Sequence, residues 1–149
     1  PEFNIHADPE AASAVFDSGA TVHMFGLDVC RQVPVGDAAV ARLLALPGPR
    51  AALFAGYLDG YADIARQRGR PAQPLYDPTP VAWLAQPQLF TLQPARVDVE
   101  LHGQHTRGMT VCDLRPKALA RANAQVAMGA QGPAVLDWAL QRLEAVLAA

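Results

Sequence analysis

The feature that most constrains the fold of this chain is that the spacing of its apolar residues changes along the sequence. Between residues 50 and 67 they recur at intervals of three and four, which is the period of one face of an α-helix. Between residues 95 and 101 they alternate with charged residues, which is typical of a half-exposed strand. A chain that carries both periods is predicted to have an α/β fold, with a mixed sheet and flanking helices. The apolar residues of the helical stretch are Leu53, Phe54, Tyr57, Leu58, Tyr61 and Ile64.

Capping signals and turn residues place further elements around these two. Asp8 and Pro9 are a typical N-cap and first residue of a helix, which is predicted to end at Gly19. The nearly continuous apolar character of residues 21–27 indicates a buried strand of a parallel sheet. The other predicted elements are helices at residues 37–46, 78–86 and from 132 onward, and strands at residues 108–112 and 122–128.

Composition and charge exclude several classes of protein. The chain has 149 residues, enough for one domain with a sizeable core, and a net charge of −2. Its basic residues cluster only at residues 66–70, so nucleic acid is not an expected partner. No apolar run has the length of a membrane span, so no membrane partner is expected and a cytoplasmic location is the default. Cys30 and Cys112 lack metal-ligand spacing and are predicted to be buried thiols in a reducing compartment.

Four side chains carry chemistry whose role the residues alone leave open. Pro78 disfavours a helical backbone at Asp77, which is therefore predicted on a loop before a helix, either as an N-cap or as a ligand of a hard cation. Tyr76 is either a half-buried ring before that helix or a contact to a ligand. Tyr61 lies on the apolar stripe and is either a core residue or part of a pocket. His23 is predicted to be a buried core histidine.

Three segments carry a recognisable combination of residues, namely Pro1-Glu2-Phe3-Asn4, Leu75-Tyr76-Asp77-Pro78 and Thr106-Arg107-Gly108-Met109-Thr110-Val111. In this order and spacing, the chain resembles the inosine-uridine preferring nucleoside hydrolase family. The resemblance extends to residues 24–29, 87–90 and 121–127 and so covers nearly the whole chain. It implies that residues 1–149 are the C-terminal portion of a single nucleoside-hydrolase-like, Rossmann-like domain. The N-terminal half of that domain is then absent and is the expected partner.

The resemblance implies roles for particular residues. Members of the family bind one Ca²⁺ ion with an N-terminal aspartate cluster, which this chain lacks, and with a later aspartate that matches Asp77. Glu2 and Asn4 match residues that hydrogen-bond the ribose hydroxyls, and Tyr61 matches an aromatic border of the base pocket. Tyr76 stands where many members have a histidine that protonates the leaving base, and a tyrosine is a weaker acid at neutral pH. Asp77 is expected to face the same cleft as Glu2 and Asn4.

The function that the resemblance implies is hydrolysis of the N-glycosidic bond of a ribonucleoside to a base and ribose, with Ca²⁺ as cofactor. Without the aspartate cluster, the chain is expected to be inactive by itself and not to bind Ca²⁺ alone. The alternative is a non-catalytic remnant that binds a sugar or interacts with another protein. An absent half would leave a sheet edge and an apolar surface uncovered, so self-association into a homo-oligomer is expected.

Overall fold

A computed structural model describes residues 1–148 of the chain, which form two compact units. Unit 1 comprises residues 1–27 and 92–128, and unit 2 comprises residues 28–91 and the described residues from 129 onward. Strands that pair in both directions and helices that flank them confirm the predicted α/β fold with a mixed sheet. Within residues 1–148, no helix has the length and apolar character needed to cross a membrane.

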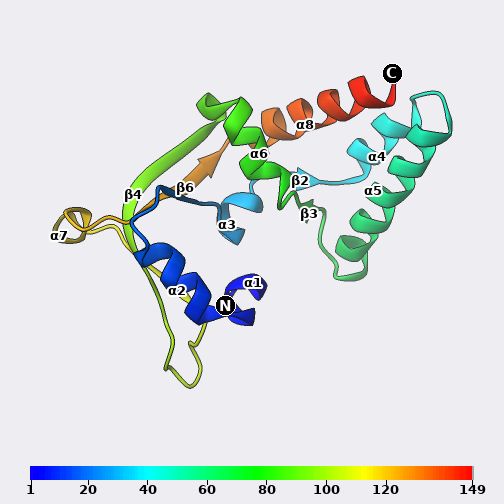
Figure 1. Cartoon of the computed structure of the whole chain (residues 1–149). Coiled ribbons are helices and arrows are strands. Elements are labelled where there is room, and N and C mark those ends of the chain that lie inside the picture. The colour runs from blue at the N-terminus through cyan, green and yellow to red at the C-terminus, as the bar shows by residue number, and fades with distance from the viewer. Residues whose placement is uncertain (149) are drawn as a thin grey trace. The chain divides into compact units, whose positions relative to one another are not determined.

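Unit 1 contains most of a four-stranded sheet with the strand order β1-β6-β4-β5. Strand β1 runs parallel to β6, whereas β4 and β5 form an antiparallel hairpin, in which Val97 lies opposite Cys112. Helices α1 and α2 follow one another at the blue end of the chain in Figure 1. The first residues of β4 and the last residues of β6 belong to unit 2. The elements are α1 (Phe3–Ala7), α2 (Pro9–Asp17), β1 (Val22–Met24), β4 (Phe90–Val99), β5 (Thr110–Asp113), α7 (Pro116–Leu119) and β6 (Ala124–Ala130).

The core of unit 1 forms where α2 packs on the sheet. Phe16 of α2 joins Val97 and Val99 of β4 in one buried cluster, and the charged residue between the two valines is exposed. This alternation confirms the predicted period of two. The predicted start of α2 is also confirmed, because the Asp8 carboxylate accepts a hydrogen bond from the Ala11 amide at 2.9 Å.

Unit 2 is mainly helical. Figure 1 shows α4 and α5 side by side, and residues of both helices share a buried cluster with Leu140 of α8. Arg42 of α4 forms ion pairs with Asp137, at 2.5 Å, and with Glu144, both on α8. The short strands β2 and β3 pair antiparallel. The elements are α3 (Leu27–Cys30), β2 (Pro34–Val35), α4 (Asp37–Leu44), α5 (Pro49–Gln67), β3 (Gln73–Pro74), α6 (Pro78–Ala85), the 3-10 helix η1 (Pro87–Leu89) and α8 (Gly132–Leu147).

The buried face of α5 differs from the predicted apolar stripe. Leu58 and Tyr61 of the stripe are half-buried, but its four other residues are exposed, including Tyr57 at 67%. The side chains that α5 buries completely are small, and small side chains allow helix backbones to approach closely. Packing therefore selects the small face over the more hydrophobic one. The buried residues of α5 are Ala51, Ala55, Ala62 and Ala65.

Two further predictions are wrong because they concern the edges of the sheet. Strand β1 is shorter than predicted and half-buried, and His23 on this edge strand is exposed. Cys112 is exposed rather than buried, since it lies on the opposite edge strand, β5. Cys30 is buried as predicted. An edge strand has a neighbour on one side only, so its side chains are covered less than those of a central strand.

Candidate functional site

The residues with predicted chemical roles fall into two groups, one in each unit. Tyr61, Tyr76 and Asp77 belong to unit 2, whereas Glu2 and Asn4 belong to unit 1. A cleft shared by both groups stays a prediction. Tyr76 and Asp77 lie in the turn between β3 and α6, and Tyr61 lies on α5. The second group lies at the start of α1.

The turn that carries Tyr76 and Asp77 is fixed by hydrogen bonds on both sides. On the strand side, the Leu75 amide donates to the Val33 carbonyl at 2.8 Å. On the helix side, the buried Thr79 hydroxyl donates to the Leu75 carbonyl at 2.5 Å, and the Thr79 amide donates to the Tyr76 carbonyl at 2.9 Å. The backbone of this turn is therefore held in place, while both side chains between these bonds are exposed.

Tyr61 anchors the same turn from helix α5. Its hydroxyl donates a hydrogen bond to the Pro74 carbonyl at 2.5 Å. Burial, and then the negative forms of Tyr76, Asp77 and Cys30, raise the pKa of Tyr61 to about 12. Tyr61 therefore stays protonated near neutral pH and remains a donor.

Asp77 directly precedes α6, as predicted, but its backbone conformation differs from the prediction. Its φ and ψ of −59° and −33° are helical, since the Thr79 amide closes the turn onto the Tyr76 carbonyl, although Asp77 precedes a proline. It occupies the N-cap position of α6, but its side chain makes no capping hydrogen bond there. Burial, and then the charges of Asp28 and Asp77, raise the pKa of the Cys30 thiol. The exposed Asp77 carboxylate therefore does not cap α6.

The donor set around Asp77 does not by itself make a calcium site. Ca²⁺ takes about six to eight oxygen ligands in proteins. Among residues 1–148, no three or more His, Cys, Asp or Glu side chains are grouped so that they could hold a metal ion. The chemistry of Asp77 fits one ligand of such an ion, and the described residues do not fit a complete site.

Glu2 and Asn4 lie on a short helix that the sequence patterns do not predict. Glu2 is the N-cap of α1, and its Oε2 accepts a hydrogen bond from the Ile5 amide at 3.0 Å. Ile5 is half-buried against the core of unit 1, whereas Asn4 is exposed in the first turn. The signal for α1 is weak, because glutamate is not a preferred N-cap and five residues are too few to show a period.

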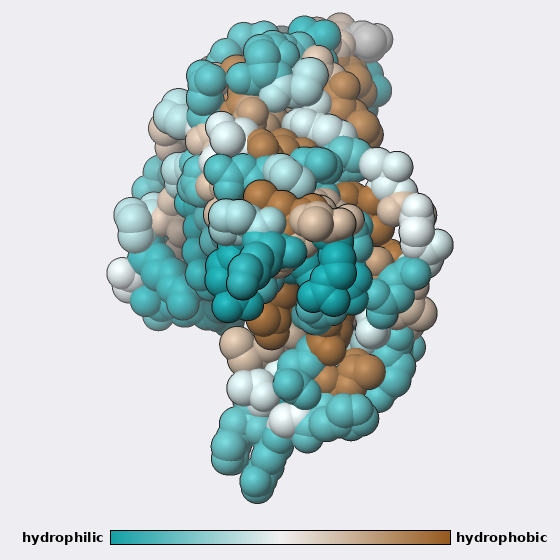
Figure 2. All heavy atoms as spheres, turned by 90° about the vertical axis from the view of Figure 1, so that its left-hand side faces the viewer, coloured by the Kyte–Doolittle hydropathy of each residue, from teal (hydrophilic) through white to brown (hydrophobic). Residues whose placement is uncertain are grey.

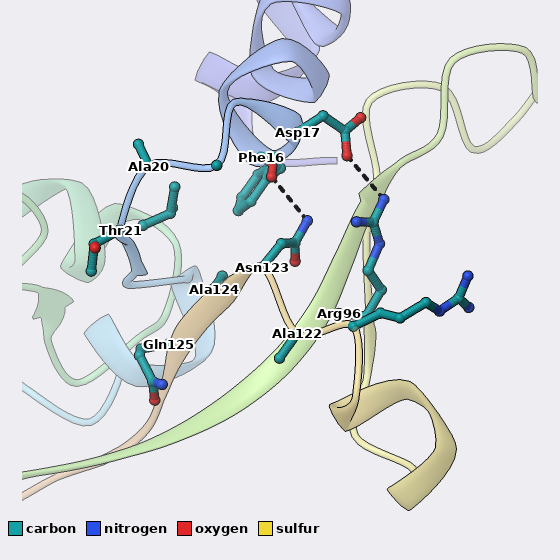
Figure 3. Close-up of a pocket in the computed structure, with 12 residues that line it drawn as sticks. Phe16, Asp17, Ala20, Thr21, Arg96, Ala122, Asn123, Ala124 and Gln125 are labelled. Carbon is teal, nitrogen blue, oxygen red and sulfur yellow. Dashed lines mark hydrogen bonds and ion pairs between the residues drawn. The ribbon is translucent and has the colours of Figure 1, made fainter.

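A pocket of about 440 Å³ in unit 1 contains none of the predicted site residues (Figure 3). Arg96, which lines it, pairs with Asp17 at 2.9 Å and with Asp98 at 2.6 Å. Asn123, another lining residue, donates to the carbonyls of Phe16 and Val97. Its polar groups thus join α2 to β4. The pocket also lies at the amino ends of the parallel strands β1 and β6, whereas ligands of α/β sheets bind at the carboxyl ends.

Comparison with known proteins identifies related sequences for nearly the whole chain. Residues 1–137 match the family model described as inosine-uridine preferring nucleoside hydrolase. The chain is 42% identical to a pyrimidine-specific ribonucleoside hydrolase RihA of Shewanella woodyi and 37% identical to that of Salmonella typhimurium. Each match covers 96% of this chain, and 46% and 47% of those proteins. The chain therefore spans about half the length of the curated relatives it matches.

Solved structures agree with the sequence comparison. A purine-preferring ribonucleoside hydrolase from Gardnerella vaginalis superimposes with a TM-score of 0.85 at 31% identity, over 97% of this chain and 46% of that one. A plant nucleoside hydrolase, PpNRh1, superimposes with a TM-score of 0.84 at 24% identity, over 97% of this chain and 48% of that one. The second likeness concerns the fold alone.

Proposed function

Because the chain belongs to the inosine-uridine preferring nucleoside hydrolase family, we propose that the protein containing it hydrolyses ribonucleosides to a base and ribose. The observation that carries this proposal is the Tyr76–Asp77 turn. Hydrogen bonds from the Tyr61 and Thr79 hydroxyls hold its backbone in place. The exposed Asp77 carboxylate makes no capping hydrogen bond to α6. Reacting groups must be held in a defined geometry before the reaction, and a pinned turn meets this requirement.

In the proposed site, Asp77 is one ligand of a Ca²⁺ ion whose other ligands lie outside this chain. The ion, when bound, supplies positive charge that orients the ribose hydroxyls and a water molecule. Tyr76, next in sequence, is proposed to contact the leaving base, and Tyr61 is proposed to border the base while holding the turn. The role of this chain is then to place one carboxylate and two aromatic rings with the backbone held in place.

Glu2 and Asn4 are proposed to hydrogen-bond the ribose. The helix cap uses one oxygen of Glu2, and a carboxylate has acceptor capacity beyond a single hydrogen bond. Asn4 is exposed and carries both a donor and an acceptor, which suits a pair of neighbouring hydroxyls. Hydrogen bonds of this kind orient the sugar before bond cleavage.

The test compares the 149-residue chain with the protein expressed from its complete reading frame. Release of base is measured from uridine, cytidine and inosine, with Ca²⁺ and after its removal by a chelator. We expect hydrolysis only where further carboxylates complete the metal site, so the chain alone has no turnover. The relatives named pyrimidine-specific make uridine and cytidine the first substrates to test.

Two variants locate the activity within the site. Asp77→Asn removes the proposed metal ligand and is expected to lower turnover by at least about a hundredfold. The matched control is Asp63→Asn, which alters a carboxylate whose partners are Arg66 and Gln67. Equal activity in Asp77→Asn and Asp63→Asn would contradict the proposed metal ligand. Absence of any Ca²⁺-dependent turnover from the complete protein would instead favour the non-catalytic, sugar-binding alternative.

A further inference from the structure

Of the three segments that carry the family resemblance most clearly, Thr106–Val111 is the one to which the proposed function gives no role, and it closes the β4–β5 hairpin. The hairpin loop, residues 100–109, has a defined internal structure. Oε1 of Glu100 accepts hydrogen bonds from the His102 amide at 2.8 Å and from the Gly103 amide at 2.9 Å. These backbone donors lower the pKa of Glu100. These internal hydrogen bonds give the loop a defined conformation, so it can support a helix that packs against it.

Gly108 brings this loop into contact with α1. Its φ of +80° lies in the left-handed region that favours glycine, and the residue is buried. A methyl group at this position would lie 2.9 Å from Cα and 3.1 Å from Nδ1 of His6. Any residue larger than glycine is therefore disfavoured at position 108 for two reasons, namely the left-handed backbone conformation and the close contact with α1.

Arg107 ties the same loop to α2. One guanidinium nitrogen donates to the Leu101 carbonyl at 2.6 Å, within the loop, and another pairs with the Glu10 carboxylate at 2.8 Å, in the first turn of α2. The Arg107 guanidinium lowers the pKa of Glu10 through this hydrogen bond. Two adjacent residues of the loop thus contact the two consecutive helices at the start of the chain.

Helix α1 depends on such contacts because it cannot be stable by itself. It has five residues and none of them is buried. Isolated helices shorter than about 12 residues are marginal in water. Supports within its own sequence include the Glu2 cap, the His6 amide bond to the Glu2 carbonyl at 2.9 Å and the half-buried Ile5. The position of Glu2 and Asn4 is therefore set largely by what α1 touches.

We propose that Arg107 and Gly108 are positioning residues, which hold α1 so that Glu2 and Asn4 are oriented toward the ribose of the substrate. Arg107 acts by fixing the loop and α2, and Gly108 acts by letting the loop approach α1. This inference rests on the proposed function for the role of Glu2 and Asn4, but not for the contact between the loop and α1.

The contact is tested first, by amide hydrogen exchange of the 149-residue chain. Gly108→Ala is expected to speed exchange in residues 3–7 at least about tenfold, because local opening becomes easier. The matched control is Gly19→Ala, since Gly19 is also left-handed, with φ of +78°, but has open space around it. Unchanged exchange in a folded Gly108→Ala chain overturns the proposal.

Arg107 variants keep the test decisive if Gly108→Ala does not fold. Arg107→Gln is expected to speed exchange in residues 3–7 and 8–12, and Arg107→Lys to restore part of the protection, because lysine keeps the charge but not the fork geometry. Arg115→Gln, which removes an arginine paired with Asp113, is the control and should leave both segments unchanged. Equal exchange in Arg107→Gln and the unmodified chain overturns the role of Arg107.

Kinetics of the protein from the complete reading frame test the positioning itself. Arg107→Gln is expected to raise KM for the nucleoside at least about fivefold and to change kcat less than about twofold, because binding contacts to ribose are lost. Simple loss of folded enzyme would lower kcat and leave KM unchanged. Faster exchange with unchanged KM overturns the positioning of Glu2 and Asn4. If the unmodified complete protein has no turnover, the proposed function and the positioning role of Arg107 and Gly108 are both refuted. The contact between the loop and α1 is then tested by amide hydrogen exchange alone.

Discussion

At the scale of single residues, the Tyr76–Asp77 turn combines a fixed backbone with exposed side chains. The hydroxyls of Tyr61 and Thr79 donate hydrogen bonds to two consecutive backbone carbonyls, those of Pro74 and Leu75. Neither hydroxyl proton is then available for donation to a ligand without breaking the turn. The side chains that remain to meet a substrate are those of Tyr76, which is 39% exposed, and Asp77.

A first prediction concerns Tyr76 in the protein from the complete reading frame. Because a tyrosine is a weak acid at neutral pH, cleavage should depend on how readily the base leaves. Nitrophenyl riboside, which needs no protonation of its leaving group, should be hydrolysed faster than uridine. Tyr76→Phe should change the rate on nitrophenyl riboside less than about threefold. Equal loss of activity on both substrates would show that Tyr76 acts on the sugar or on the fold.

A second prediction contrasts two glycines of unit 2. A methyl group at Gly132 would lie 1.6 Å from the Gln32 carbonyl oxygen, so Gly132→Ala must displace the start of α8. We expect it to lower the free energy of unfolding by at least about 2 kcal/mol in urea denaturation. Gly60 lies on the exposed face of α5 with open space around it. Gly60→Ala should therefore raise the free energy of unfolding by roughly 0.5–1 kcal/mol. Equal effects of the two substitutions would contradict the packing described.

At the scale of elements, unit 2 is held together by charged side chains as well as by its core. Arg66 of α5 pairs with Asp37, the first residue of α4, and with Asp59 and Asp63 of its own helix. Arg42 of α4 pairs with two carboxylates of α8. The Arg66–Asp37 pair joins α5 to α4, but both side chains are largely exposed, so the pair contributes little free energy and α5 packs mainly through its alanines.

A third prediction follows from the Arg42–Glu144 pair. The Arg42 guanidinium lowers the pKa of Glu144 below its ordinary value of 4.5. The pair therefore stabilises the fold above that value, and its contribution is lost as the pH falls through the lowered folded pKa. Arg42→Gln should lower the melting temperature at neutral pH.

The effect of Arg42→Gln on the melting temperature should diminish as the pH is lowered from neutral through the lowered pKa of Glu144. Arg142→Gln, on the exposed side of the same α8, is the control and should show no such pH dependence. A difference between Arg42→Gln and the unmodified chain that stays constant over this range would refute the assignment.

At the scale of the whole molecule, apolar side chains are exposed in both units. The face shown in Figure 2 is mainly hydrophilic, with separate hydrophobic patches among the polar residues. Phe3 of α1 is 81% exposed, and Leu84 of α6 is 74% exposed. The edge strand β5 adds Val111, which is exposed beside Cys112. Exposed apolar surface and unpaired strand edges favour association.

A fourth prediction is therefore that the 149-residue chain self-associates as its concentration rises. Light scattering coupled to size exclusion should show a mass above that of the monomer. Tyr57→Ser on the exposed face of α5 should reduce the association, whereas Gln104→Ser, a polar change in the hairpin loop, should not. A monodisperse monomer at high concentration would contradict this prediction.

The sequence by itself determines those features that depend only on residues close to one another in the chain. The N-cap at Asp8 is set within one helical turn, and the alternation around Val97 is set within one strand, so both are predicted correctly. The membership of the family also follows from short segments in order. The length of β1 and the helix α1 are missed, because both are too short for a period to be visible.

Only the tertiary structure decides which of several acceptable faces is buried and which side chains meet. Helix α5 has an alanine face and a larger apolar face, and its neighbour selects the alanines. Cys112 has the residue type of a core position but lies on an edge strand. The bonds from Tyr61 to Pro74 and from Arg107 to Glu10 join residues 13 and 97 positions apart. A local pattern does not encode such pairs, because they form only when the chain folds and brings distant segments into contact.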